Sequence, residues 1–151
     1  MAEIAARCTM VSIVVLRGCD TLLVQRHGAS MDGIWTYVAG HIEPDESGWQ
    51  TALRELLEET ALIPQALYAT SFCEQFYDAR ADCVQVVPAF VAVVDEEAEV
   101  RLNHEHSAFR WLPLAEAADI FPFGGQRDLI AHVQREFVER SPHPRLCIDL
   151  K

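Results

Sequence analysis

Hydrophobic and polar positions divide the chain into short apolar runs, separated by turns, and two stretches of helical period. The apolar runs are rich in β-branched and aromatic residues, which predicts strands. These runs are residues 9–16, 21–25, 35–39, 66–76, 83–94 and 109–112. Apolar residues recur at helical spacing over 47–60 and 126–139, which predicts two helices. Pro88 lies inside a predicted strand and indicates a sheet edge or a bulge there.

Strands with two interspersed helices are typical of an α/β or α+β sandwich. The chain has 151 residues, half of them hydrophobic. A chain of this length suits one domain, here 1–151, that buries about 70% of the surface of its unfolded form. We expect the core to cover about residues 9–138 and the tail, 141–151, to be peripheral.

The compartment is predicted from apolar runs and cysteines. No apolar run approaches the 18 residues or so of a membrane span, and the N-terminus lacks the long apolar stretch of a secretory signal. The five cysteines are odd in number and contain no Cys-x-x-Cys pair. This favours reduced thiols, buried as small hydrophobic residues, over disulfides. We therefore expect a cytoplasmic protein with no membrane partner.

The formal net charge of −11 is concentrated in one segment. Residues 40–60 contain six acidic residues and one basic residue, a net charge of −5. A negative charge disfavours duplex nucleic acid as a partner. An anionic ligand would need a divalent cation as a bridge.

The first predicted helix has two unlike faces. Ser47, with Gln50 three residues later, forms the signature of a capping box. The apolar residues fall in one arc, expected to face the core: Trp49, Ala52, Leu53, Leu56 and Leu57. Glu55, Glu58 and Glu59 fall in the opposite arc, where like charges repel unless a hard cation lies between them. Mg²⁺ suits such oxygen ligands, and an acidic solubility face is the alternative.

The order of residues in this segment is more specific than its composition. It reads Gly40-x5-Glu46-x7-Arg54-Glu55-Leu56-x-Glu58-Glu59-x-Ala61-Leu62 and resembles the Nudix box of hydrolases that act on nucleoside diphosphates linked to another group. All charged positions of the box are filled. Ala61 stands where the family has a glycine, which usually supplies the left-handed backbone at a helix end. Alanine in that conformation would cost about 1 kcal/mol.

Segments outside the box extend the resemblance. Residues 22–26 and 32–35 look like the flank that precedes the box in MutT-type members, and 103–112 looks like an acid-then-tryptophan segment of the family. The latter spacing is also similar to that of the dihydroneopterin triphosphate pyrophosphohydrolases. The resemblance implies the Nudix α/β/α sandwich with a central mixed β-sheet. Because many relatives dimerise, a homodimer stays open.

The resemblance also implies roles for the box residues. Water would attack a phosphorus of a pyrophosphate bond with the help of Mg²⁺, for which Mn²⁺ can substitute. Glu58 and Glu59 would be metal ligands, and Glu55 a further ligand or the base. Arg54 would orient Glu55 through a charge-assisted hydrogen bond. Glu46 would be an auxiliary metal ligand, or would contact the ligands without contacting the metal itself.

Residues outside the helix complete the expected site. Glu105 is expected as a further ligand or as the base, and a solvated loop acid is the alternative. The backbone carbonyl of Ala39, which replaces a common glycine, would help to hold metal. Arg26 and His41 are candidates for phosphate contacts, although both are also typical of a protein surface. The histidines beside Glu105 favour zinc only weakly, because no third ligand stands at a standard spacing.

The substrate class is the least determined feature. The resemblance implies a nucleotide or nucleotide-like substrate, and the MutT-like flank favours a compact triphosphate over ADP-ribose, nucleotide sugars or dinucleoside polyphosphates. Four aromatic residues are candidates to stack on a base, with core packing or rim exposure as the alternative: Phe76, Tyr77, Phe121 and Phe123. Two other functions are the alternatives. A module that binds nucleotides without turnover would be expected to lose charged residues of the box, and an isomerase of isoprenoid diphosphates would be expected to need a catalytic cysteine.

Overall fold

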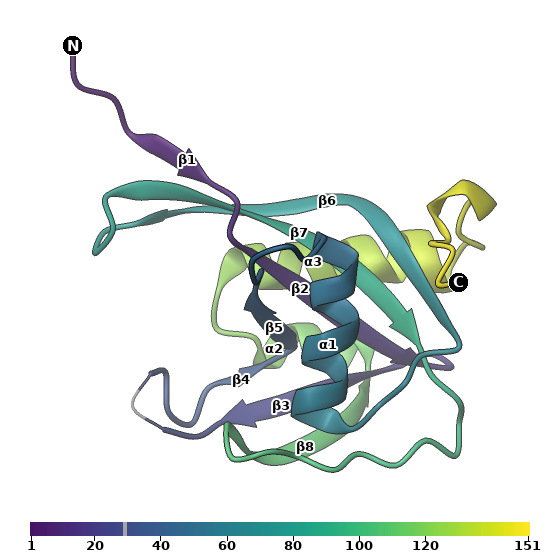
Figure 1. The fold of residues 1–151 in the computed structure, drawn as a ribbon. Coiled ribbons are helices and arrows are strands. Elements are labelled where there is room, and N and C mark those ends of the chain that lie inside the picture. The colour runs from purple at the N-terminus through teal and green to yellow at the C-terminus, as the bar shows by residue number, and fades with distance from the viewer. Residues whose placement is uncertain (29) are drawn as a thin grey trace.

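The computed structural model describes residues 1–28 and 30–151. Within these residues, eight strands form one mixed sheet (Figure 1). The strands are β1 (Ala5–Arg7), β2 (Met10–Arg17), β3 (Asp20–Arg26), β4 (Trp35–Thr36), β5 (Val38–His41), β6 (Ala66–Asp78), β7 (Cys83–Val93) and β8 (His106–Pro113). The α-helices are α1 (Gly48–Thr60), α2 (Leu114–Ile120) and α3 (Gly124–Val133). A π-helical turn, Gln134–Val138, continues α3, and a 3-10 turn, Pro144–Leu146, lies near the C-terminus.

Strand β2 is the centre of the sheet. Its residues 12–16 pair in parallel with 89–93 of β7, and its residues 10–13 pair antiparallel with β5. Strand β3 pairs antiparallel with β2, β4 and β8, while β7 also pairs with β1 and β6. Parallel and antiparallel pairs therefore share one sheet, as the family resemblance implies.

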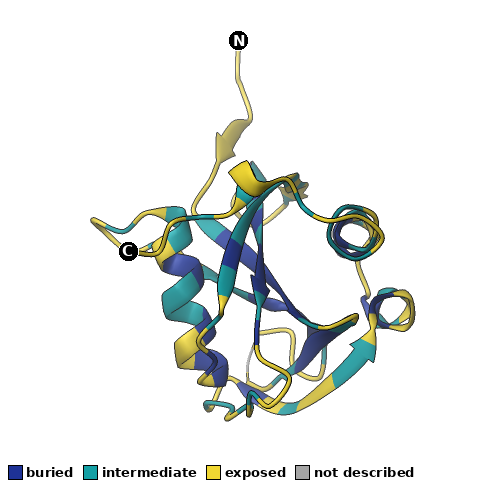
Figure 2. Ribbon diagram, turned by 90° about the vertical axis from the view of Figure 1, so that its right-hand side faces the viewer, coloured by how far each residue is buried: buried dark blue, intermediate teal, exposed yellow. Residues whose placement is uncertain are grey.

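The two faces of the sheet pack against different helices. Val11, Ile13 and Val15 of β2 belong to the core cluster that includes residues of α1. Val14 and Leu16, which point the other way because side chains alternate along a strand, belong to the cluster that includes residues of α2 and α3. Figure 2 shows the buried strands between the helices on either side. The predicted α/β/α sandwich is confirmed.

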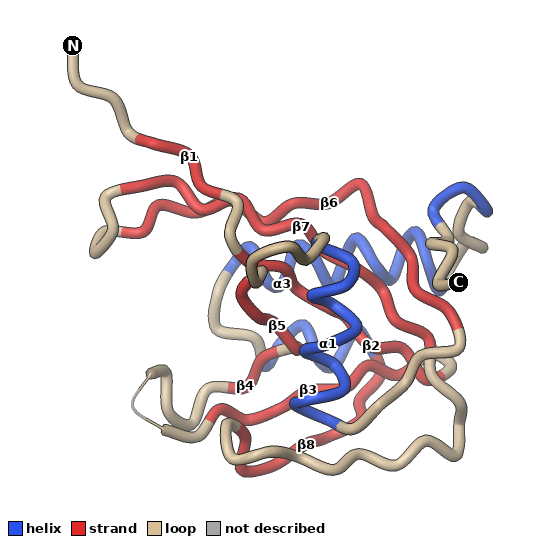
Figure 3. The backbone as a smooth tube through the Cα atoms, in the orientation of Figure 1, coloured by secondary structure: helices blue, strands red, loops and turns tan. Residues whose placement is uncertain are grey.

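The predicted strands and the first helix are confirmed, with ends that shift by a few residues (Figure 3). The run at 35–39 is two short strands, and the second predicted helix is α3 with its π-helical continuation. The pattern does not predict β1 or α2. Strand β1 is exposed and is formed by pairing with β7 rather than by apolar alternation, and α2 is too short to display a helical period.

Of the sheet edge or bulge expected at Pro88, the structure has a bulge beside it. The β6–β7 register shifts between Ala69 and Cys73, so the extra residues lie on β6, and Pro88 pairs with Cys73 at one end of the shift. Along its other edge, β7 pairs with β1 up to Gln85 and with β2 from Ala89 onward. Proline lacks a backbone N–H. Pro88 lies between these two paired segments of β7, where no hydrogen bond from its nitrogen to β1 or β2 is needed.

Two expectations about burial are wrong. Leu57, expected in the core, is 50% exposed. The buried arc of α1 contains Ala52, Leu56 and Glu59, so it is rotated toward the glutamates and leaves Leu57 outside. Of the cysteines, all five are free as expected, but only Cys83 is buried.

The C-terminal tail, expected to be peripheral, is joined to the sheet. Cys147 forms an isolated bridge with Tyr68, and the N–H of Ile148 donates to the carbonyl of Leu67 at 2.8 Å. Ile148 also packs against the core on the α1 side.

Across the described residues, no helix is long and apolar enough to cross a membrane.

Candidate active site

Capping interactions at both ends of α1 fix where the helix begins and ends, and with it the position of its acidic side chains. The hydroxyl of Ser47 accepts the N–H of Gln50 at 3.3 Å, and Gln50 Oε1 accepts the N–H of Ser47 at 2.8 Å, which confirms the capping box. At the other end, Ala61 has φ 61° and donates its N–H to the carbonyl of Leu57 at 2.9 Å. The left-handed conformation that the family assigns to glycine is thus adopted by alanine here.

Arg54 ties the loop before α1 to the helix itself. Its Nε and Nη2 donate to the two carboxylate oxygens of Glu46 at 2.8 and 3.0 Å. Its Nη1 donates to Glu55 Oε1 at 2.8 Å and to Glu58 Oε2 at 3.3 Å. Nη2 also donates to the backbone carbonyl of His41 at 3.0 Å. One guanidinium therefore fixes three carboxylates and the end of β5.

Glu46 is engaged in holding that arginine. The hydrogen bonds from Arg54, followed by the hydroxyl of Thr51 at 2.6 Å, lower the pKa of Glu46 to about 2. The backbone N–H of Glu43 donates to the same carboxylate at 3.2 Å. Charge-assisted bonds of this kind favour the ionised carboxylate.

Glu59 has the opposite environment. It is only 4% exposed, and its Oε2 has no hydrogen-bond partner in the described part of the chain. Burial, and then the charges of Glu55 and Glu105, raise its pKa to about 9. Burial also raises the pKa of Glu55, although Arg54 opposes the shift. A buried carboxylate without a counter-charge is costly, so Glu59 is in an unfavourable environment as an ionised group.

These side chains line one cavity of about 430 Å³, which we call the acidic cavity. It brings together six of the predicted site residues: Arg26, Ala39, His41, Glu55, Glu59 and Glu105. Gly40 also lines the acidic cavity. A Cβ at this position would overlap the side chain of Glu55, so glycine allows that side chain to lie against the strand. The structure does not bring Glu46 or Glu58 into the lining, since Glu46 is bound by Arg54 and Glu58 is 56% exposed beside it.

The acidic cavity is not a preformed metal cage. As the side chains stand, no three His, Cys, Asp or Glu residues among 1–28 and 30–151 could hold a metal ion. Part of the reason is that Glu55 and Glu58 both direct an oxygen at Arg54. His104 and His106 lie outside the lining of the acidic cavity, and His106 is buried instead. The pair thus gives no support to a zinc site here.

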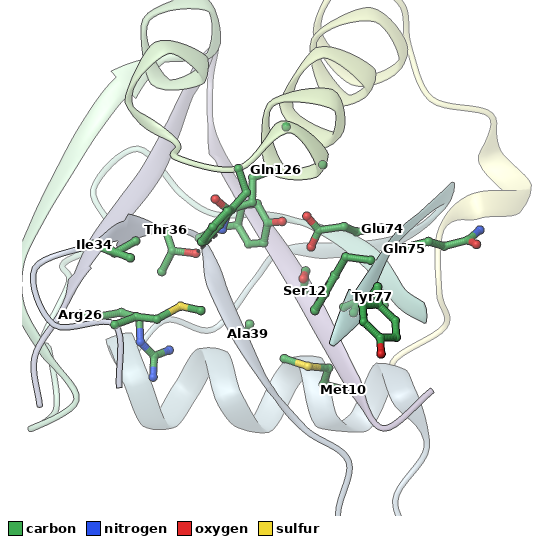
Figure 4. A pocket seen from close by; sticks show the side chains of 17 residues that line it. Met10, Ser12, Arg26, Ile34, Thr36, Ala39, Glu74, Gln75, Tyr77 and Gln126 are labelled. Atoms are coloured by element: carbon green, nitrogen blue, oxygen red, sulfur yellow. Dashed lines mark hydrogen bonds between the residues drawn. The ribbon is translucent and has the colours of Figure 1, made fainter. Parts of the chain in front are cut away.

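A second cavity of about 500 Å³, which we call the wide cavity, adjoins the first. Both are lined by Met10, Arg26 and Ala39. Figure 4 shows polar side chains from β2, β4, β6 and α3 around this space, with Arg26 on the side nearer α1. The sequence pattern does not predict five polar residues that line it: Ser12, Thr36, Tyr37, Glu74 and Gln126.

The aromatic candidates divide between rim and core. Phe76, Tyr77 and Phe123 line the wide cavity and are exposed. Phe121 is buried, with its ring centroid 5.4 Å from that of Tyr37. A sequence signal for this cavity does exist, namely the Gly124-Gly125 pair that opens α3, because a Cβ on the second glycine would lie 2.5 Å from Glu74 Oε2.

Known proteins identify the family. Residues 7–140 match the NUDIX domain. Over 128 residues the chain is 34% identical to an asymmetrical bis(5'-nucleosyl)-tetraphosphatase of Rattus norvegicus, covering 73% of this chain and 87% of the rat protein. The fold is similar to that of a C. elegans Ap4A hydrolase (TM-score 0.71, 24% identity, 86% of this chain and 98% of the other). It is also similar to that of the E. coli dihydroneopterin triphosphate pyrophosphohydrolase (TM-score 0.73, 22% identity, 91% and 99%). The chain belongs to the Nudix family of hydrolases, which act on pyrophosphate bonds.

Proposed function

We propose that this protein is a divalent-metal-dependent hydrolase of dinucleoside tetraphosphates. The observation that carries the proposal is the 34% identity over most of the length of the rat tetraphosphatase. Its name describes asymmetrical cleavage, so the expected products are a nucleoside triphosphate and a nucleoside monophosphate. This substrate takes the place of the compact triphosphate that the flanking sequence favours.

The two cavities support a substrate of this shape. Ligand sites typically measure about 300–1,000 Å³, and the acidic and wide cavities, at about 430 and 500 Å³, adjoin each other. A nucleoside in the wide cavity would direct its phosphate chain past Arg26 toward the glutamates. The second nucleoside would then lie beyond the acidic cavity.

The acidic cavity fits Mg²⁺ or Mn²⁺ by its chemistry. Glu59 contributes a buried oxygen with no partner among the described residues, and the charges of Glu55 and Glu105 act on it. Glu58, Glu59, the backbone carbonyl of Ala39 and one of Glu55 and Glu105 would hold the ion, and the other of these two carboxylates is left as the base. A bound ion would neutralise phosphate charge and make a bound water more acidic.

The remaining roles belong to the chain itself. The oxygen of a water forms a bond to one phosphorus, the bond from that phosphorus to the bridging oxygen breaks, and the electron pair leaves with the departing phosphate. Glu55 or Glu105 accepts the proton of the water. Arg54 positions Glu55, and Glu46, held in the ionised state, positions Arg54. Phosphate oxygens would meet Arg26, which lines both cavities, and His41.

The test is the identification of products from a substrate panel with Mg²⁺ or Mn²⁺. We expect dinucleoside tetraphosphates to give mono- and triphosphates, faster than nucleoside triphosphates, ADP-ribose or nucleotide sugars are cleaved. Glu58→Gln should lower the rate by more than about 100-fold, since even partners behind metal ligands are worth 10–100-fold. The exposed Glu99→Gln serves as the matched control.

Two outcomes would count against the proposal. Hydrolysis of triphosphates alone would restore the compact substrate. Tight nucleotide binding with no product under any metal would identify a binding module instead.

A further inference from the structure

The wall of the wide cavity contains buried polar atoms that the fold does not satisfy. Tyr37 is 3% exposed and Gln126 is 9% exposed. The hydroxyl of Tyr37 and Oε1 of Gln126 have no hydrogen-bond partner in the described part of the chain. The amide of Gln126 is oriented by its Nε2, which donates to the hydroxyl of Thr36 at 3.2 Å and leaves Oε1 as an acceptor. Unpaired buried polar atoms are rare in native proteins and call for an explanation.

Glu74 places a carboxylate in the same wall. It is half-buried, and no salt bridge forms to it among the described residues. Burial raises its pKa, against an opposing effect of the nearby Tyr37 hydroxyl, and its charge in turn helps to raise the pKa of Tyr37, after the larger effect of burial. A Cβ at Gly125 would lie 2.5 Å from Glu74 Oε2, so the carboxylate could not keep this position beside a larger residue. The fold therefore makes space for a carboxylate that it does not neutralise.

The first turn of α3 supplies donors next to this carboxylate. The helix starts at Gly124 and has no side-chain cap. The first N–H groups of a helix lack intrahelical partners, and residues 123–126 line the wide cavity. Figure 4 shows Gln126 and Glu74 on the same wall, beside the start of this helix. The Glu74 carboxylate, an acceptor, therefore lies beside the N–H donors at the start of α3.

We propose that the wide cavity selects a base that carries a ring N–H beside an exocyclic amino group, the 2-amino-6-oxo edge of guanine, with Glu74 as its specificity-determining residue. The two adjacent N–H donors of that edge bind the two oxygens of one carboxylate. The neighbouring carbonyl oxygen of the base accepts from the first turn of α3. Exposed rings at the rim, Phe76, Tyr77 and Phe123, offer faces for stacking.

Other common bases fit this wall less well. Adenine and cytosine present a ring acceptor next to the amino group, so one carboxylate oxygen would face a lone pair. Uracil has a single ring N–H between two carbonyls. A bidentate contact to a base edge discriminates by about 10-fold or more, and a polar group left unpaired adds to the rejection.

The inference rests on the proposed function only in taking the ligand to be a nucleotide. Pterins present the same donors and acceptor on their 2-amino-4-oxo edge, so the probes include neopterin. Calorimetry with Mg²⁺ would compare guanosine, adenosine and cytidine 5'-monophosphates with neopterin. None of these contains a pyrophosphate bond, so binding is measured without turnover.

We expect the guanosine monophosphate or neopterin to bind at least about 10-fold more tightly than the adenosine and cytidine monophosphates. The tighter of the two identifies the source of the edge. Glu74→Gln should reverse the preference toward adenosine monophosphate, because an amide pairs with adenine through one donor and one acceptor. The exposed Glu116→Gln should change nothing.

Equal affinities in the unmodified protein would overturn the inference, and so would a guanosine preference that survives Glu74→Gln. The two proposals fail separately. Selective binding of guanosine monophosphate without hydrolysis of any dinucleoside tetraphosphate would overturn the proposed function and support this inference. Equal binding of both monophosphates with hydrolysis of both guanosine and adenosine tetraphosphates would do the reverse.

Discussion

The acidic cavity and the wide cavity adjoin, yet they are built from the chain in different ways. The acidic cavity takes three of its four carboxylates, Glu43, Glu55 and Glu59, from one short segment of the chain, and the fourth, Glu105, from the turn before β8. The wide cavity collects residues from β2, β4, β5, β6 and the start of α3, which are far apart in sequence. A compact motif therefore specifies the proposed chemistry, while specificity is left to the tertiary structure.

The largest expected effect tests the acidic cavity alone. Glu59→Gln removes the buried carboxylate to which we assign a metal ion, so hydrolysis should fall by more than about 100-fold. Binding of nucleoside monophosphates in the wide cavity should keep its base preference. Steady-state rates and calorimetry on the same samples measure both. A variant that retains its rate would remove Glu59 from the ligand set.

Glu59→Gln should also change how the free energy of unfolding depends on pH. The pKa of Glu59 is raised from 4.5 to about 9 in the folded state, so between these values the folded protein binds more protons than the unfolded chain. Without metal, its contribution to the free energy of unfolding is therefore complete below about pH 4.5 and is lost as the pH rises toward 9. Glu59→Gln should flatten that decline in denaturant titrations at several pH values, and an unchanged slope would contradict the assignment.

Gly40→Ala should lower hydrolysis in the acidic cavity without changing base preference in the wide cavity. The added Cβ would overlap the side chain of Glu55, and overpacking of this kind typically costs about 1–3 kcal/mol. Displacement of Glu55 should lower hydrolysis by about 10–100-fold and leave base preference intact. Gly48→Ala is the matched control, because its Cβ would meet only ordinary contacts, at 3.6 Å or more. Equal losses in both variants would mean that the effect is not local.

Gly125→Ala is the counterpart in the wide cavity. Its Cβ would lie 2.5 Å from Glu74 Oε2, whereas one on Gly124 would lie 3.7 Å from the nearest side-chain atom, Arg127 Nη2. Alanine favours a helix over glycine, so a loss of binding would not reflect a weaker α3. We expect Gly125→Ala, and not Gly124→Ala, to reduce the preference for guanosine monophosphate by about 10-fold. Calorimetry decides, and identical behaviour of the two variants would contradict the placement of Glu74.

The contrast between the cavities also explains what the sequence predicts. The apolar, β-branched run of β2 and the capping box of α1 are local features, so this strand and this helix follow from the sequence pattern. The burial of Glu59 is not local, because the docking of α1 on the sheet decides which arc faces inward. The proximity of Glu74 to Gly125 depends on β6 meeting α3, which no spacing encodes. Sequence therefore predicts the acidic residues well and the walls of the wide cavity poorly.

The smallest expected effect concerns neither cavity. Ala61 ends α1 in the left-handed conformation, with φ 61°, which glycine adopts without the steric cost that a Cβ imposes. Ala61→Gly should therefore raise the free energy of unfolding by about 1 kcal/mol, and leave hydrolysis and base preference unchanged, because the backbone already holds the required geometry. Denaturant unfolding measures the change. Ala131→Gly, at an exposed position of α3, is a control of opposite sign and should lose about 1 kcal/mol. If Ala61→Gly instead altered the rate, the end of α1 would be coupled to its glutamates, and the Nudix glycine would serve the chemistry as well as the helix end.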